Sequence, residues 1–104
     1  MIREELRGLK APAAEPLSVA MWTVPQCTAC MQTYRRLCAA GVPVSVLPLA
    51  QSPEVAEFAA EAELTSAPVV LGIRPDGTSV WWSGFNAERI REWGDMARKE
   101  RDRV

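Results

Sequence analysis

The chain contains no histidine and few cysteines, three in 104 residues. The absence of imidazole excludes Cys–His catalysis, Ser–His triads and histidine metal sites. There is no excess of basic charge, because 12 Lys and Arg stand against 13 Asp and Glu for a formal net charge of -1. A nucleic-acid partner is therefore not expected. No apolar run approaches the roughly 18 residues that a membrane span needs, so a membrane partner is not expected either.

The chain begins Met-Ile-Arg-Glu-Glu-Leu-Arg, with acids where a secretory signal has a basic start and an apolar middle. The cysteines, Cys27, Cys30 and Cys38, are odd in number and clustered, whereas a secreted disulfide scaffold usually has an even, dispersed set. The length allows one domain. These features predict a small cytoplasmic protein, and we expect it to be a monomer.

The composition divides the chain into three parts. Residues 1–16 end in an Ala- and Pro-rich stretch and are predicted to form an N-terminal extension. Residues 17–97 have the regular apolar patterns of one folded domain. Residues 98–104 are a charged C-terminal tail that we expect to fray.

Apolar periodicity and chain breakers predict the elements of the folded part. Strands are expected at residues 17–24, 43–49, 67–73 and 78–82, and helices at residues 27–40, 52–62 and 86–97. Ser52 and Asn86 are expected to cap the second and third helices. The order β-α-β-α-β-β-α predicts an α/β domain with a four-stranded mixed sheet flanked by helices. Its first strand–helix–strand unit should have a right-handed crossover.

Apolar residues at helical spacing predict the buried faces of the helices. The expected buried residues are Cys30, Tyr34, Leu37 and Cys38 in the first helix, Val55, Phe58, Ala59 and Ala62 in the second, and Ile90, Trp93 and Ala97 in the third. Cys38 is thus expected to be a small buried hydrophobe. The first strand is apolar on both sides, which predicts burial on both faces.

The most informative motif is Cys27-Thr28-Ala29-Cys30, which joins the first strand to the first helix. Cys27 falls at the helix start, where unpaired backbone N–H groups and the helix dipole favour an anion. Because the thiolate is the reactive form of cysteine, this position should lower the pKa of Cys27 and make it the attacking nucleophile. Cys30, one turn later, is close enough to form a disulfide and is expected to be the resolving thiol.

A Cys-X-X-Cys pair can also be half of a metal site. A structural zinc takes four ligands, however, and this chain offers three thiols and no imidazole. A metal or Fe–S cluster held across a dimer is the alternative from a different class, a binding module rather than an enzyme. We favour dithiol–disulfide chemistry with no bound metal or cofactor.

Several segments together resemble the glutaredoxin-like NrdH-redoxin family. They are Thr23-Val24-Pro25-Gln26-Cys27-Thr28-Ala29-Cys30, Ala67-Pro68-Val69-Val70 and Trp82-Ser83-Gly84-Phe85, within a likeness that runs from about Leu17 to Ala97. The resemblance implies a thioredoxin-type fold with a cis Ala67–Pro68 bond beside the thiols. It further implies partner-binding roles for Pro25, Gln26, Thr28, Ala29, Ala67, Pro68, Trp82, Ser83, Gly84 and Phe85. Core packing is an equal explanation for Trp82 and Phe85.

The resemblance also implies a function in electron transport for deoxyribonucleotide synthesis. The partners of the family are class Ib ribonucleotide reductase, which it reduces, and thioredoxin reductase, through which NADPH recharges it. The alternative enzyme is a glutaredoxin or mycoredoxin that acts on mixed disulfides with a low-molecular-weight thiol. Asn86 disfavours that alternative, because it puts a neutral amide where glutaredoxins have a glutathione-binding Asp. The chain departs from both groups at Val24, where a Lys is common, and so lacks one stabiliser of the Cys27 thiolate.

Overall fold

A computed structural model describes residues 17–102 of the chain. The strands are β1 (Ser18–Thr23), β2 (Val44–Pro48), β3 (Val69–Ile73) and β4 (Ser79–Ser83). They form one mixed sheet in the order β2-β1-β3-β4. β1 pairs in parallel with β2 and antiparallel with β3, and β3 pairs antiparallel with β4. The predicted N-terminal extension, residues 1–16, lies outside the described residues.

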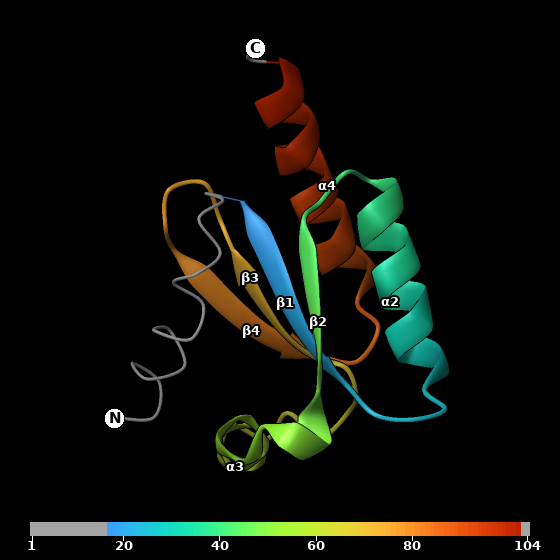
Figure 1. The fold of residues 1–104 in the computed structure, drawn as a ribbon. Helices are drawn as coiled ribbons and strands as arrows, with labels where there is room; N and C mark the ends of the chain where they lie inside the picture. Colours follow the sequence, from blue (N-terminus) through green and yellow to red (C-terminus); the bar gives the residue numbers. More distant parts are fainter. Residues whose placement is uncertain (1–16, 103–104) are drawn as a thin grey trace.

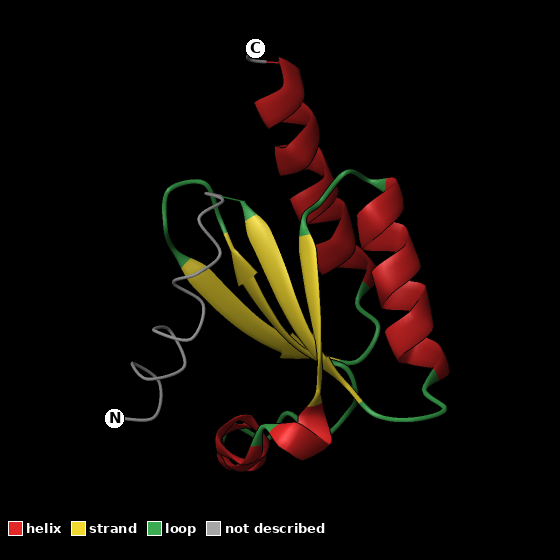
Figure 2. Ribbon diagram, in the orientation of Figure 1, coloured by secondary structure: helices red, strands yellow, loops and turns green. Residues whose placement is uncertain are grey.

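The helices cover the two faces of this sheet. They are α2 (Thr28–Ala39), α3 (Pro53–Glu61) and α4 (Ala87–Asp102), and a short 3-10 helix spans Leu49–Gln51. Helices α2 and α4 lie side by side on one face, and α3 lies apart from them at the end where β2 stops (Figure 1; Figure 2). The observed order confirms the predicted β-α-β-α-β-β-α architecture. None of the described helices is long and apolar enough to cross a membrane.

Two apolar clusters, one on each face of the sheet, form the core. Under α2 and α4, Val19 and Met21 of β1 pack with Leu37 and Trp93. On the opposite face, the alternate β1 residues pack against α3. Because side chains alternate along a strand, both faces of β1 are covered, and the prediction of a doubly buried strand is confirmed.

The helix ends agree with the sequence in part. Asn86 caps α4 as predicted, since its Oδ1 accepts a hydrogen bond from the Arg89 N–H at 3.1 Å. The predicted side-chain cap at Ser52 is wrong: no side-chain capping bond forms there, and the Ser52 hydroxyl instead faces the Pro48 carbonyl at 3.4 Å. Helix α4 continues to Asp102, so residues 98–102 are helical rather than frayed.

The predicted apolar stripe of α2 needs correction. The buried residues are Cys30, Thr33 and Leu37, whereas Tyr34 is 45% exposed and Cys38 is exposed. At about 100° per residue, Thr33 and Leu37 fall on one side of Cys30 around the helix axis, and Tyr34 and Cys38 fall on the other. The sheet covers only the first side. The prediction that Ala62 is buried is also wrong: Ala62 is exposed and is the residue after the last residue of α3, Glu61.

Candidate active site: the disulfide at the start of helix α2

The chain reaches the site from the end of β1 through a short turn. Gln26 in this turn has a φ of 56°, in the left-handed region that non-glycine residues seldom adopt. Cys27 then has an extended backbone, and Thr28 begins α2. Cys27 is therefore the N-cap residue, the position where a side chain can accept a hydrogen bond from an unpaired helical N–H.

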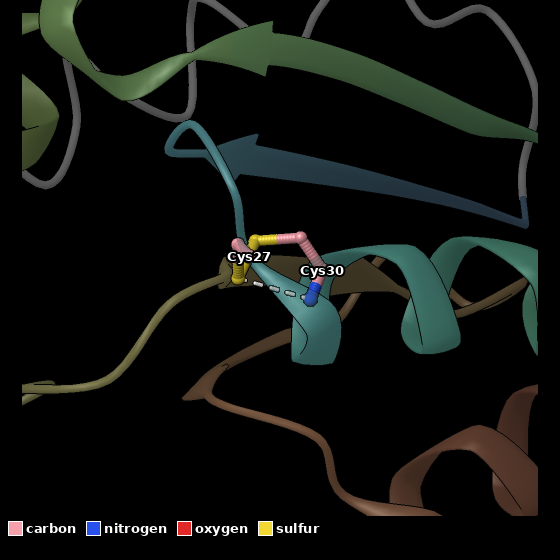
Figure 3. The surroundings of a disulfide bond; sticks show 2 residues. All are labelled: Cys27 and Cys30. Carbon is pink, nitrogen blue, oxygen red and sulfur yellow. Dashed lines mark hydrogen bonds between the residues drawn. A yellow bond between two sulfur atoms is a disulfide. The ribbon is translucent and has the colours of Figure 1, made fainter.

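Cys27 and Cys30 form a disulfide, with their Cα atoms 5.2 Å apart (Figure 3). The backbone N–H of Cys30 donates a hydrogen bond to the Cys27 Sγ at 3.1 Å, drawn as the dashed line in Figure 3. When the pair is reduced, this N–H and the positive end of the helix dipole favour a negative charge on the same sulfur. Both effects lower the pKa of a thiol at this position.

The two cysteines differ in exposure. Cys30 is 5% exposed and belongs to the core cluster beneath α2, whereas Cys27 is only half-buried. Cys27 is therefore the more accessible of the two cysteines. This asymmetry favours Cys27 as the attacking thiol and Cys30 as the resolving thiol.

Two further segments belong to the surroundings of the site: the residues just before β3, which include Ala67 and Pro68, and the residues at the end of β4, which lead to Phe85. The Ala67–Pro68 bond is cis, which confirms the expectation from the family resemblance. Ala67 and Cys27 pack against the same apolar cluster, which contains Cys30. The Gly84 N–H donates to the Pro68 carbonyl at 2.8 Å, and Gly84 has a φ of 76°, which favours glycine. This hydrogen bond holds the Trp82–Phe85 segment against the Pro68 loop.

The remaining predicted partner-binding residues differ in accessibility. Pro25, Gln26 and Thr28 are exposed, while Ala29, Ala67, Ser83 and Gly84 are half-buried, and Pro68 is buried. Trp82 is 5% exposed, and its ring packs at a tilt of 53° against the Trp93 ring with the centroids 5.3 Å apart, so its side chain serves core packing. Phe85 is 37% exposed, and the Arg36 guanidinium lies over its ring at 5.4 Å.

The structure adds residues that the sequence analysis did not assign to the site. A groove of about 430 Å³ is lined by Cys27 and Cys30. Four exposed apolar residues also line it: Val24, which the family resemblance already linked to Cys27, and the newly found Met31, Tyr34 and Val46. Met31 is four residues after Cys27, so helical spacing could have placed it beside that cysteine. Val46 comes from β2, and only its register with Met21 of β1 brings it to the groove.

The third thiol lies outside this arrangement. Cys38 is free and exposed on α2, and its hydrogen bond with Tyr34 raises the pKa of the Tyr34 hydroxyl. Within residues 17–102, no group of three or more His, Cys, Asp or Glu side chains is placed to hold a metal ion. The reactive groups at the site are Cys27 and Cys30, which form a disulfide when oxidised and two thiols when reduced.

Comparison with known proteins gives structural matches only. No family model and no curated protein matches the chain. The NrdH-redoxin of Escherichia coli, a glutaredoxin-like protein with a thioredoxin-like activity profile, is 24% identical with a TM-score of 0.61, over 72% of this chain and 92% of that chain. Fasciola hepatica thioredoxin is 23% identical with a TM-score of 0.55, over 86% of this chain and 88% of that chain. A chloroplastic thioredoxin z is 15% identical with a TM-score of 0.62, over 88% of each chain.

These matches identify the thioredoxin fold. In this fold the chain places a Cys-X-X-Cys disulfide at the start of a helix, with Cys27 half-buried and Cys30 buried. The chemistry that this arrangement supports is thiol–disulfide exchange.

Proposed function

We propose that the protein is a dithiol–disulfide oxidoreductase that passes two electrons to a disulfide in a protein partner. The observation that supports this most directly is the Cys27–Cys30 disulfide at the start of α2. In it, the Cys27 Sγ accepts a hydrogen bond from the backbone N–H of Cys30. The structure has the oxidised pair, so the active electron donor is the dithiol form of the same two residues.

The reaction takes place in two exchange steps. The Cys27 thiolate attacks one sulfur of the partner's disulfide, forming a mixed disulfide and releasing the partner's other sulfur as a thiolate, which takes a proton from solvent. The Cys30 thiol then loses its proton, and its thiolate attacks the Cys27 sulfur. This forms the Cys27–Cys30 disulfide and releases the second partner thiolate. The partner gains two electrons, and the protein loses them.

For the partners, we propose those implied by the NrdH-redoxin resemblance: a ribonucleotide reductase as electron acceptor, and a thioredoxin reductase that returns electrons from NADPH. The likeness to Escherichia coli NrdH-redoxin, which extends over 92% of that chain, supports the choice. So does Asn86, whose amide oxygen is occupied in capping α4 and offers no carboxylate to glutathione. A reducing compartment such as the cytoplasm is the setting in which this dithiol is regenerated.

The Cys30→Ser variant tests the mechanism. With an oxidised protein substrate, its turnover should fall at least about a hundredfold, because the step that releases the partner is missing. Mass spectrometry should find the mixed disulfide on Cys27. Cys38→Ser is the matched control, since it removes an exposed thiol outside the disulfide and should leave turnover unchanged. Cys30→Ser is also to be tested on mixed disulfides with glutathione or mycothiol. If it still turns these over, the result would instead favour the glutaredoxin or mycoredoxin alternative.

A second experiment tests the electron source. Purified thioredoxin reductase with NADPH should reduce the Cys27–Cys30 disulfide, which the absorbance of NADPH reports as steady consumption when an oxidised protein substrate is present. A glutathione or mycothiol couple serves as the comparison. Faster reduction by the low-molecular-weight thiol would contradict the proposed partners but not the dithiol mechanism.

A further inference from the structure

A second groove, of about 580 Å³, lies between α2 and α4. The two helices run side by side on the same face of the sheet (Figure 1). Small residues let them approach: a Cβ added at Gly94 would lie 3.1 Å from the Cβ of Ala40. Ala39, Ala40 and Gly94 contribute small residues to the lining, and longer side chains from both helices line the rest.

The longer side chains are mainly cationic. Arg36 of α2 and Arg91, Arg98 and Arg101 of α4 line the groove, and Asp95 is the acidic residue among the lining side chains. Asp95 pairs with Arg98 at 3.3 Å. Within residues 17–102, no ion pair neutralises the other three guanidinium groups. A chain with a net charge of -1 thus gathers a local excess of positive charge here.

Helix dipoles explain part of this cluster. Arg36 and Arg101 lie in the last turns of α2 and α4, where a cation is favourable against the negative helix end. Arg91 lies in the first half of α4, and the dipole effect does not extend beyond the terminal turn. The helix dipole therefore does not account for the position of Arg91, whose acidic neighbours at helical spacing on α4 are Glu88 and Asp95.

One series of contacts links this groove to the Pro68 loop of the candidate active site. Arg36 lies over the Phe85 ring, and Phe85 follows Gly84, whose N–H is bonded to the Pro68 carbonyl. From Arg91 to Arg101, ten residues of helix extend the cationic row about 15 Å along α4. This row is longer than a single phosphate or carboxylate group, and its length equals that of about four or five residues of extended polypeptide.

We infer that the groove between α2 and α4 binds an acidic polypeptide segment of the protein whose disulfide reacts with Cys27. This inference rests on the proposed function, because it names the class of partner that the disulfide serves. Opposite charge would speed the encounter and orient the partner, with the acidic segment along α4 and its disulfide towards Cys27.

Two synthetic peptides with the same disulfide test the inference, one followed by five acidic residues and the other by five neutral residues. The full-length protein in its dithiol form should reduce the acidic peptide about tenfold faster at low ionic strength. The preference should shrink as salt screens the charges. Fluorescence anisotropy of a labelled acidic peptide without cysteine gives a separate measure of binding.

The Arg91→Glu/Arg101→Glu variant should lose this preference, with a ratio of the two rates near one. The control is Arg35→Glu/Lys99→Glu, which changes the net charge by the same amount. It is also matched in position, because Lys99 lies in the last turn of α4, as Arg101 does. Arg35 and Lys99 do not line the groove, so the control should keep most of the preference.

An equal rate for the two peptides in the wild type would overturn the inference, as would an equal loss of preference in both variants. A protein that reduces neither peptide, yet binds the acidic probe through Arg91 and Arg101, would contradict the proposed redox function and still support the acidic-segment surface. The two proposals therefore fail on different measurements.

Discussion

A cation at position 24 should make the Cys27 thiol more acidic. Val24 is 38% exposed and lines the same groove as Cys27 and Cys30. Val24→Lys would place an ammonium group beside the Cys27 thiolate without disturbing the core. Since an opposite charge favours the charged form of a neighbouring group, the variant should have a lower Cys27 pKa than the wild type.

The exposure of Val24 sets the size of the effect. A side chain at this surface position interacts through a medium closer to water than to the protein interior, with an effective dielectric constant of about 40 to 80. At a separation of about 6 Å, two unit charges then interact by about 0.7 to 1.4 kcal/mol, which lowers the pKa by about half to one unit. Well below the pKa the thiolate fraction rises about three- to tenfold. Because a less basic thiolate is also a weaker nucleophile, about half of this gain on a logarithmic scale is lost, and the alkylation rate should be about two- to threefold higher.

The assay is the rate of alkylation by iodoacetamide as a function of pH. It requires a Cys38→Ser background, because Cys38 is exposed and would also react. Val24→Gln in the same background is the control, since it has a long polar side chain without a charge. Added salt should reduce the difference between the two variants by screening. Superimposable pH profiles for Val24→Lys and Val24→Gln would refute the reasoning.

Other predictions concern stability. Gly72→Ala should lower the free energy of unfolding by about 1 to 3 kcal/mol in denaturant titrations, because a Cβ at Gly72 would collide with the buried Trp93 ring. Asn86→Ala should cost about 1 kcal/mol in the same measurement by removing the α4 cap. Asp76 has a lowered pKa, caused first by the hydrogen bond from the Thr78 side chain. Its contribution to stability is therefore complete above its unfolded-state pKa and is lost as the pH falls towards the lower folded-state pKa, so Asp76→Ala should lose less stability than the wild type on acidification.

Each stability prediction has its own comparison. Asn86→Ser should keep most of the stability that Asn86→Ala loses, because a hydroxyl can also cap a helix. An unchanged unfolding midpoint for Gly72→Ala would mean that the Trp93 ring can move aside. Parallel curves of stability against pH for the wild type and Asp76→Ala would show that the hydrogen bonds of Asp76 do not persist in solution.

Local patterns along the chain were enough to predict the elements, their order and the position of Cys27 at the start of α2. Strand alternation, the turn at Pro25-Gln26 and the Cys-X-X-Cys spacing are short-range signals, and the observed N-cap geometry agrees with them. The cis bond before Pro68 was different, since only the family resemblance implied it. A residue pair alone does not distinguish a cis from a trans X–Pro bond.

Long-range packing decided which helix faces are buried and what surrounds the disulfide. Tyr34 and Cys38 have the spacing of a buried stripe, yet the sheet covers α2 on the side of Thr33 and Leu37 instead. The approach of Val46 to the groove depends on strand register. The gathering of arginines between α2 and α4 depends on the packing of two helices that 47 residues, 40–86, separate in the sequence. Spacing along a chain determines which residues share a face of an element, whereas the neighbour that this face meets is a property of the assembled fold.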